Sequence, residues 1–443
     1  MNKIRTYLKS LYDDVHLMEL LRGASSTLMI KLFGLLVGYG FAIYITNKYG
    51  AFVFGQYVTA LLVVEILSII SRLGIDTSLV KFISKYAKNG SVNLINQLYF
   101  KSVALVTFSA IFFTLLLLFF SVEIAEFMNL NRDYLLVVSF SFIPLVLFYM
   151  NVQAIRGLKK MLSYSFLNNV AITLGVFILL VMFSMFITSE MLPIYAYVSS
   201  VFILSLLSYF LWFNHKAKVS VENIVNEEPL STNKLLTTSF PLLLGQSMMI
   251  IMGKVDLFML ANMSGSVQVG IYNIALKLSM LSYMGLMAVN SIAAPKFSEI
   301  DSTGDIEALK KIVQQSTKTI FWVSIPVLTI LLLFPEYILS VFGDEFKVAS
   351  YTLIILSIGK MFSAISGSVG TFLQMVGKQK VFQNILILAA IINVGLNYLL
   401  IPIYGIGGAA IASAVSGIFW NVLMIIYIKK NFGFYTIYIP WIK

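Results

Sequence analysis

Long apolar stretches, separated by short polar segments, fill almost the whole chain of 443 residues. A helix needs about 20 predominantly apolar residues to cross a bilayer, and the chain contains twelve such stretches. An open sheet would leave backbone groups without hydrogen bonds in lipid, so all twelve are predicted to be helices. They lie near residues 24–46, 51–71, 103–121, 134–155, 162–187, 191–213, 235–261, 270–294, 316–335, 350–372, 383–401 and 404–428.

One long polar segment, residues 214–234, divides these stretches into two sets of six and has the composition of a cytosolic linker. A shift of 215 residues superposes Gly50 on Gly265 and Gly55 on Gly270. This match predicts two related halves, 1–213 and 235–443, each of which returns the chain to the same side of the membrane. The predicted fold class is an all-α integral membrane protein with 12 transmembrane helices in two parallel six-helix bundles around a central cavity.

The distribution of basic residues indicates the orientation of the chain. Of its 31 lysines and arginines, 24 fall in the segments that would be cytosolic if the N-terminus is inside. Only Lys48, Arg132 and Lys347 fall in the outer loops. Because cytosolic loops carry an excess of Lys and Arg, this split predicts that both termini are cytosolic.

Composition agrees with a membrane protein. Hydrophobic residues make up 59% of the chain and the mean hydropathy is +0.90. Charged residues make up 12%, whereas soluble domains typically contain about 25%. The net charge of +11 could indicate nucleic-acid binding in a soluble protein. Here the basic residues lie in short loops and set the topology, so no nucleic-acid partner is expected.

Several kinds of chemistry are excluded by the residues themselves. The chain has no cysteine, and its two histidines, His16 and His215, fall in predicted cytosolic segments. It contains neither a G-x-x-x-x-G-K-[ST] phosphate loop nor an H-E-x-x-H motif. We therefore expect no catalytic residues, no metal site, no cofactor and no hydrolysis of ATP, and we predict that the chain is not an enzyme.

Six charged residues lie inside the apolar stretches. Four are cations and two are anions: Lys31, Lys254, Lys277, Lys360, Glu65 and Asp256. Charges in the hydrocarbon core are costly, so such residues usually face the protein interior or a water-filled cavity and tend to be functional. The excess of two positive charges predicts a polar cavity suited to an anionic solute, which favours a transporter.

Depth along the helices suggests two ion pairs. At ~1.5 Å per residue, Lys31 and Glu65 would lie at similar depth in neighbouring antiparallel spans. Asp256 and Lys277 would lie at matched depths near the outer ends of the seventh and eighth spans. We therefore expect both pairs to form. Alternatively, Lys31 and Lys277 could extend to the headgroups, and the two carboxylates could carry a coupling ion.

Lys254 and Lys360 have no evident partner in the sequence. Lys360 lies near the middle of its span, too deep to reach the headgroups. Lys254 is two residues from Asp256, about 200° around the helix, so these two side chains cannot face one cavity. We expect Lys360 to line a polar cavity.

Three stretches of the C-terminal half resemble a known family. Residues 393–402, NVGLNYLLIP, followed by IYGIGGAAIASAVS, look like the LN-x-x-LIP-x-YG-x-x-GAAIA-T signature of Wzx-type polysaccharide exporters, with Ser413 where Thr is commoner. The stretch from Gly253, GKVDLFMLANMSGSVQVGIYNIALKL, is similar to the seventh and eighth spans of that family. FPEYILSVFGDEFKVAS, from Phe334, is like its outer loop before the tenth span. These exporters belong to the multidrug/oligosaccharidyl-lipid/polysaccharide superfamily.

The resemblance implies a flippase that moves an undecaprenyl-diphosphate-linked oligosaccharide from the inner to the outer leaflet of the cell inner (cytoplasmic) membrane. Such transport serves the synthesis of surface polysaccharides, including O-antigen, lipopolysaccharide and exopolysaccharide. The implied partners are this lipid-linked glycan, the lipid bilayer and the polysaccharide polymerase machinery. The candidate substrate-binding residues are Lys254, Lys360, Lys31 and Lys277, and Glu65 and Asp256 are candidates for an ion pair or for coupling.

Three alternatives remain open at this point. A cation-coupled multidrug or small-solute antiporter would share the architecture, although the surplus of intramembrane lysine argues against a cationic drug. A membrane glycosyltransferase or polymerase would normally need a large outer loop, whereas the longest one here is residues 122–133. A membrane scaffold that transports nothing would have no use for the buried charges.

Overall fold

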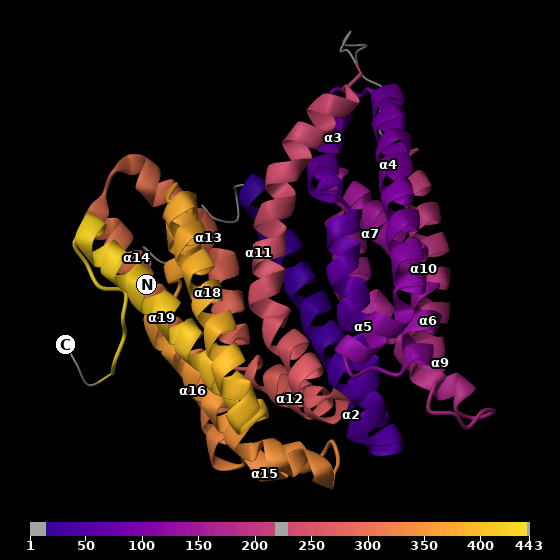
Figure 1. The fold of residues 1–443 in the computed structure, drawn as a ribbon. Helices are drawn as coiled ribbons and strands as arrows, with labels where there is room; N and C mark the ends of the chain where they lie inside the picture. The colour runs from indigo at the N-terminus through magenta and orange to yellow at the C-terminus, as the bar shows by residue number, and fades with distance from the viewer. Residues whose placement is uncertain (1–14, 218–228, 441–443) are drawn as a thin grey trace. The chain divides into compact units, whose positions relative to one another are not determined.

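The computed structural model describes residues 15–217 and 229–440, and it describes side chains for 27–217, 229–243 and 253–440. Within these ranges every regular element is a helix (Figure 1). The side chain of His16 and residues 218–228 of the predicted linker lie outside the described residues.

The helices of the N-terminal half follow each other closely along the chain. They are α2 (Val15–Ser71), α3 (Ile75–Lys88), α4 (Val92–Phe119), α5 (Ser121–Phe127), α6 (Arg132–Ser139), α7 (Phe142–Gly157), α8 (Met161–Phe166), the π-helical turn η1 (Leu167–Ala171), α9 (Ile172–Phe183) and α10 (Leu192–Lys216).

The C-terminal half contains the remaining elements. They are α11 (Thr232–Ser264), α12 (Ser266–Ser279), α13 (Met284–Thr303), α14 (Ile306–Leu333), α15 (Pro335–Ser340), the 3₁₀ helix η2 (Asp344–Ala349), α16 (Ser350–Ser366), α17 (Val369–Met375), α18 (Gln379–Tyr404) and α19 (Ile406–Phe432).

The number of membrane crossings follows from helix length and apolarity. Eight helices of the described chain are long and apolar enough to cross, and two bent helix pairs bring the total to ten. The apolar part of α2 is 45 residues long, or about 68 Å, which is roughly twice the ~30 Å hydrocarbon core. It breaks at Gly50, where φ is 79° and ψ is 176°, so α2 supplies two crossings. The helix α11, with 33 residues, is also long enough to cross, so the described helices are consistent with the predicted twelve spans.

The described chain forms two compact units that are not contiguous in sequence. The first comprises residues up to 41, 64–121 and 136–244, and the second comprises 42–63, 122–135 and the residues from 245 onward. The predicted division into 1–213 and 235–443 separates the chain by its order in sequence. These two units instead group the segments that contact one another in space. In each unit the packed elements are helices, in agreement with the predicted all-α class.

The first unit holds a buried ion pair and a buried hydrogen-bond chain. Arg72 pairs with Asp76 at 2.8 Å, and its guanidinium lies 4.6 Å from the centroid of the Tyr149 ring. Farther along α7, Asn151 accepts a hydrogen bond from Tyr99 at 2.6 Å and donates one to Ser208 at 3.0 Å. These bonds satisfy polar side chains that would otherwise be costly in a membrane.

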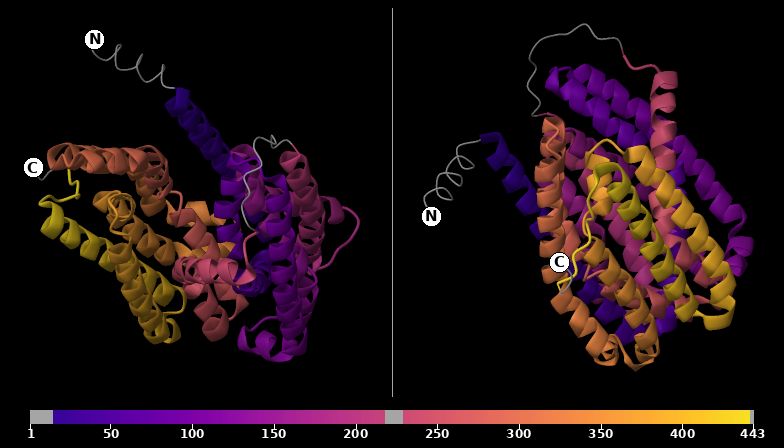
Figure 2. Two further views of the ribbon diagram at one scale, coloured as in Figure 1. Left: turned by 90° about the horizontal axis from the view of Figure 1, so that it is seen from above. Right: turned by 90° about the vertical axis from the view of Figure 1, so that its left-hand side faces the viewer.

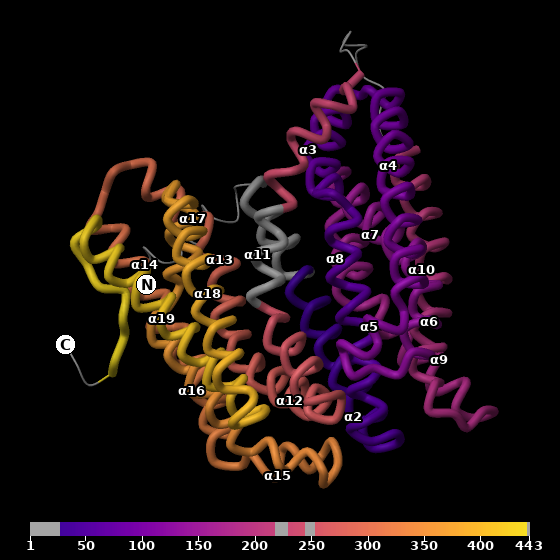
Figure 3. Tube along the Cα trace, in the orientation of Figure 1, coloured from indigo at the N-terminus to yellow at the C-terminus, as the bar shows by residue number. Residues whose placement is uncertain are grey.

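In the second unit α18 and α19 pack along each other (Figure 2), and α16 contacts both α12 and α19 (Figure 3). An apolar core lies between α13, α14, α17 and α19, where the rings of Phe297 and Phe372 meet edge to face at 5.8 Å. The helices α12, α16, α18 and α19, together with α11, carry most of the candidate site.

The second unit also contains a close crossing that supports the predicted repeat. Gly50 and Gly265 adopt nearly the same unusual conformation, with φ of 79° and 81° and ψ of 176° and 173°. A Cβ at Gly55 would collide with the carbonyl oxygen of Ser266, and one at Gly270 would lie 2.6 Å from that of Ala51. The shift of 215 residues relates Ala51 to Ser266 and Gly55 to Gly270, so the contact is reciprocal.

We therefore expect Gly55→Ala to destabilise the protein, since backbone must move to admit the new methyl group. Overpacking of this kind costs roughly 1–3 kcal/mol. The matched control is Gly395→Ala in α18, where a Cβ meets nothing within 4 Å; there alanine should be neutral or stabilise by up to ~1 kcal/mol. Thermal unfolding of both purified variants in detergent measures the difference. Equal melting temperatures would contradict the close crossing.

Candidate functional site

A buried carboxylate in α11 is the centre of a polar network. Asp256 is 6% exposed. It accepts hydrogen bonds from the hydroxyl of Tyr272 at 2.8 Å, from the amide of Asn397 at 2.7 Å and from the hydroxyl of Ser413. The three donors come from α12, α18 and α19, so four helices of the second unit meet at this carboxylate.

The network continues along α18 and α19. The amide of Asn397 also donates to Asn393 at 3.1 Å, and Asn393 donates to Ser416 at 3.2 Å. Asn393 and Asn397 are four residues apart, and Ser413 and Ser416 are three apart, so each pair lies on one face of its helix. All of these side chains except Ser413 are buried. Connected hydrogen bonds in a low dielectric hold such a group rigidly.

Lys360 in α16 is the cation associated with this network. Its side chain is partly buried, and its Nζ lies 5.6 Å from the centroid of the Tyr283 ring. It is also attracted electrostatically to Asp256. The sequence offered no evident partner for Lys360, and the structure places the Tyr283 ring beside its ammonium. An ammonium over an aromatic face is stabilised by the ring quadrupole.

The expected ion pair between Lys31 and Glu65 stays a prediction. Lys31 is exposed on α2, next to the exposed side chains of Leu32 and Phe33. Glu65 is partly buried in the same unit and interacts electrostatically with Tyr149. Matched depth fixes the height of two side chains along their helices but not the direction in which each helix presents them, so depth alone cannot establish the pair.

The expected pairing of Asp256 with Lys277 also stays a prediction. The hydrogen bonds to the carboxylate come from three neutral side chains, as described above. Lys277 is partly buried in α12, with its Nζ 5.9 Å from the centroid of the Phe54 ring. Lys254 is partly buried and lies two residues before Asp256 on the same helix. The roles assigned to the four lysines and two carboxylates remain predictions.

The side chains that hold Asp256 were not predicted as a group. Ser413 and the segment 393–402 were noted only for their resemblance to family motifs, and Ser416 was not singled out. A signal was available, because Asn393 and Asn397 in one apolar span, and Ser413 and Ser416 in the next, recur at helical spacing. Polar side chains on one face of a membrane helix commonly hydrogen-bond to neighbouring helices.

Two family models match the chain. The one described as polysaccharide biosynthesis protein matches residues 20–301, which is more than half of the chain. The MatE model matches residues 241–399, a range that includes both Asp256 and Lys360.

Curated relatives match over shorter ranges. The chain is 30% identical over 149 residues to the probable low-salt glycan biosynthesis flippase Agl15 of Haloferax volcanii, which is 33% of this chain and 32% of that protein. It is 27% identical over 166 residues to a putative O-antigen transporter of Shigella flexneri, which is 36% of this chain and 38% of that protein. The chain thus spans about a third of the length of each of these relatives.

Solved structures match over nearly the whole chain. An inward-facing multidrug resistance MATE family transporter of the MOP superfamily aligns with a TM-score of 0.74 at 14% identity, covering 93% of this chain and 98% of that one. The lipid II flippase MurJ, in an inward closed conformation, aligns with a TM-score of 0.67 at 15% identity, covering 91% and 88%. At this identity the likeness shows the fold. The family model that matches more than half of the chain shows that this chain belongs to the polysaccharide biosynthesis protein family, as its sequence motifs suggested.

Proposed function

We propose that this multi-pass membrane protein is a lipid-linked oligosaccharide flippase. It would move undecaprenyl-diphosphate-linked glycan repeat units across the cell inner membrane for the synthesis of surface polysaccharide, with both termini in the cytosol. The glycan polymerase machinery would receive the units on the outer side. Relatives named as a glycan flippase and an O-antigen transporter support this proposal.

The observation that carries the proposal is the environment of Lys360. Within the described residues, the acceptors of Asp256 are engaged by three neutral donors, and the ammonium of Lys360 lies over the Tyr283 ring. An ammonium has three donors and binds phosphate as a point charge. Placing such a charge in a membrane costs roughly 2.5–3.5 kcal/mol on insertion scales, which a bound anion would offset.

The chemistry of the substrate agrees with this arrangement. A diphosphate is anionic and the attached sugars are strongly polar, so neither crosses the hydrocarbon core unaided, whereas the polyprenyl tail can remain in lipid. Lys360 and Lys254 would attract the diphosphate, and Lys31 and Lys277 would add positive potential. Glu65 and Asp256 would position these cations or carry a coupling ion.

A specific observation favours one alternative, a cation-coupled antiporter. The MatE model covers Asp256, whose carboxylate is surrounded by hydroxyl and amide groups. Such oxygen-rich surroundings could also hold a small cation or a proton. The surplus of intramembrane lysine still makes a cationic drug a poor substrate.

Reconstitution separates the two functions. The purified protein is placed in liposomes that carry undecaprenyl-diphosphate-linked oligosaccharide from the source organism. An impermeant periodate reagent then measures how much glycan becomes accessible on the outer leaflet. We expect protein-dependent exposure of the glycan and no transport of a cationic rhodamine dye. Dye transport driven by a proton or sodium gradient, with the glycan unmoved, would replace the flippase by the antiporter.

A further inference from the structure

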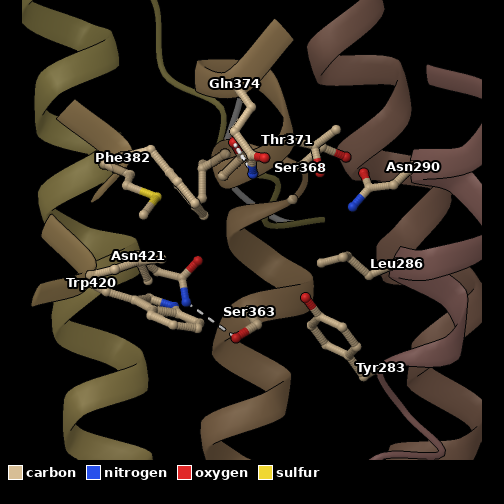
Figure 4. Close-up of a pocket in the computed structure, with 15 residues that line it drawn as sticks. Tyr283, Leu286, Asn290, Ser363, Ser368, Thr371, Gln374, Phe382, Trp420 and Asn421 are labelled. Carbon is tan, nitrogen blue, oxygen red and sulfur yellow. Dashed lines mark hydrogen bonds between the residues drawn. The ribbon is translucent and has the colours of Figure 1, made fainter. Parts of the chain in front are cut away.

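The second unit contains a cavity of about 210 Å³ that is separate from the hydrogen bonds of Asp256. Side chains from α13, α16, α17, α18 and α19 line it (Figure 4). Three of them are carboxamides, those of Asn290, Gln374 and Asn421. None of the described residues that line the cavity is charged. Its ligand would therefore be neutral and rich in hydrogen-bonding groups.

Two polar groups at this cavity have no hydrogen-bond partner among the described residues. Ser368 is 1% exposed, and its hydroxyl makes no hydrogen bond within the described residues. The side-chain oxygen of Asn290 is also buried without a partner, and Figure 4 shows its amide pointing into the cavity. Buried polar groups are nearly always paired in folded proteins, so such groups call for an explanation, of which a ligand is one.

Other polar groups are fixed in place by the protein. The amide nitrogen of Asn421 donates to Ser363 at 3.2 Å and to the carbonyl of Gly417 at 2.7 Å. That of Gln374 donates to the carbonyl of Gly370 at 3.3 Å. These bonds hold both amides in place and leave their oxygens as acceptors. An arrangement of fixed acceptors suits a ligand that presents several hydroxyl donors.

Aromatic rings complete the wall of the cavity. Tyr283, Phe382 and Trp420 line it together with the amides. The apolar C–H face of a pyranose can pack on such rings while its hydroxyls bond to the amides. Pockets that bury a drug-sized ligand measure roughly 300–1,000 Å³, so a cavity of about 210 Å³ suits one sugar ring. A whole repeat unit would not fit.

Tyr283 connects this cavity with the cation described above. Its ring lines the cavity and also lies 5.6 Å from the ammonium of Lys360. A sugar in the cavity and a phosphate at Lys360 would thus be neighbours, as they are in a sugar linked to a diphosphate. Part of the cavity wall is held rigidly, because Val369, Leu386 and Met424 line the cavity and also belong to the packed apolar core.

We propose that this cavity binds one neutral sugar ring of the transported glycan. The inference rests on the proposed flippase function for the source of the sugar, but the recognition chemistry belongs to the cavity alone. The proposal assigns sugar binding to Asn421, Ser368 and Trp420. None of these belongs to the set of charged residues that the sequence singled out.

The test measures binding without transport. Free neutral hexoses and N-acetylhexosamines are added to the purified full-length protein, and saturation-transfer NMR detects those that bind. We expect at least one sugar to bind to the wild type. Asn421→Leu should weaken that binding by about tenfold. Asn431→Leu is the matched control, because this exposed amide lies on the same helix and bonds only locally, to Tyr427; it should leave binding unchanged.

A second variant and a competition experiment distinguish failure of the cavity assignment from failure of the proposed function. Ser368→Val removes the unpaired hydroxyl and fills part of the cavity, and it should also weaken binding; it decides the matter if Asn421→Leu does not fold. Inorganic diphosphate should not displace the sugar. Sugar binding without any flipping would retain the cavity and overturn the proposed function. Flipping at the wild-type rate by Ser368→Val and Asn421→Leu, with no sugar bound by the wild type, would overturn the cavity assignment and retain the flippase.

Discussion

Replacing Lys360 with alanine should reduce the rate of glycan flipping by at least about tenfold, while the protein still inserts into the membrane. The reason is electrostatic. Hydrogen bonds to charged groups contribute roughly 1.5–3 kcal/mol, and a tenfold change corresponds to ~1.4 kcal/mol. Without the ammonium, the diphosphate would be repelled by the carboxylate of Asp256 with one positive charge fewer to offset the repulsion. The initial rate in the liposome assay is the measurement.

Three companion variants show whether charge is the cause. Lys360→Met keeps most of the side-chain length without the charge, so it should behave like alanine. Lys360→Arg should keep part of the activity, because a positive charge binds phosphate without strict geometry. Lys310→Ala removes a partly exposed lysine that pairs locally with Glu307 and should be silent. Wild-type flipping by a Lys254→Ala/Lys360→Ala double variant would show that the substrate charge is recognised elsewhere.

The apolar pattern was sufficient to predict the helices but not the rotation of each helix about its own axis, which decides the direction of its side chains. It predicted two spans on either side of Gly50, and the structure runs one helix through both with a break at that glycine. Depth could be counted along each span, which led us to expect the pairs Lys31–Glu65 and Asp256–Lys277. Rotation about the helix axis is set by packing against other helices, and sequence periodicity in uniformly apolar spans carries little information about it.

The same limit explains why the site was only partly predicted. Lys360 was expected to line a polar environment because it lies in the middle of a span. Its relation to Asp256 and Tyr283 depends on two helices, α11 and α16, and on the turn before α13, which the sequence does not place together. The cavity beside Tyr283 was not foreseen, since its Asn, Ser and Trp side chains are scattered over α13, α16, α19 and the residue before α17 and form no motif. Such a site becomes visible only when the helices are packed.

Replacing Asp256 with alanine should be the most destabilising single change in this network. It would leave the donors of Tyr272, Asn397 and Ser413 buried without their acceptor. Each unsatisfied group costs roughly 1–3 kcal/mol, although donors within a membrane find partial substitutes. We expect a clear fall in melting temperature and in the yield of folded protein. Asp301→Ala, which removes an exposed carboxylate at the end of α13, is the matched control and should change neither.

The isosteric variant Asp256→Asn separates structure from charge. It retains one oxygen acceptor but turns an N–H₂ group toward the donors, so it should lower the melting temperature less than alanine does. It also removes the anion that attracts Lys360, and neutralising both in Asp256→Asn/Lys360→Met should recover part of the lost stability, because an uncompensated buried charge is then absent. A double variant whose loss equals the sum of the two single losses would show that the charges do not interact. If Asp256→Asn instead folds normally and flips glycan at the wild-type rate, the carboxylate neither holds the four helices together nor couples transport to an ion.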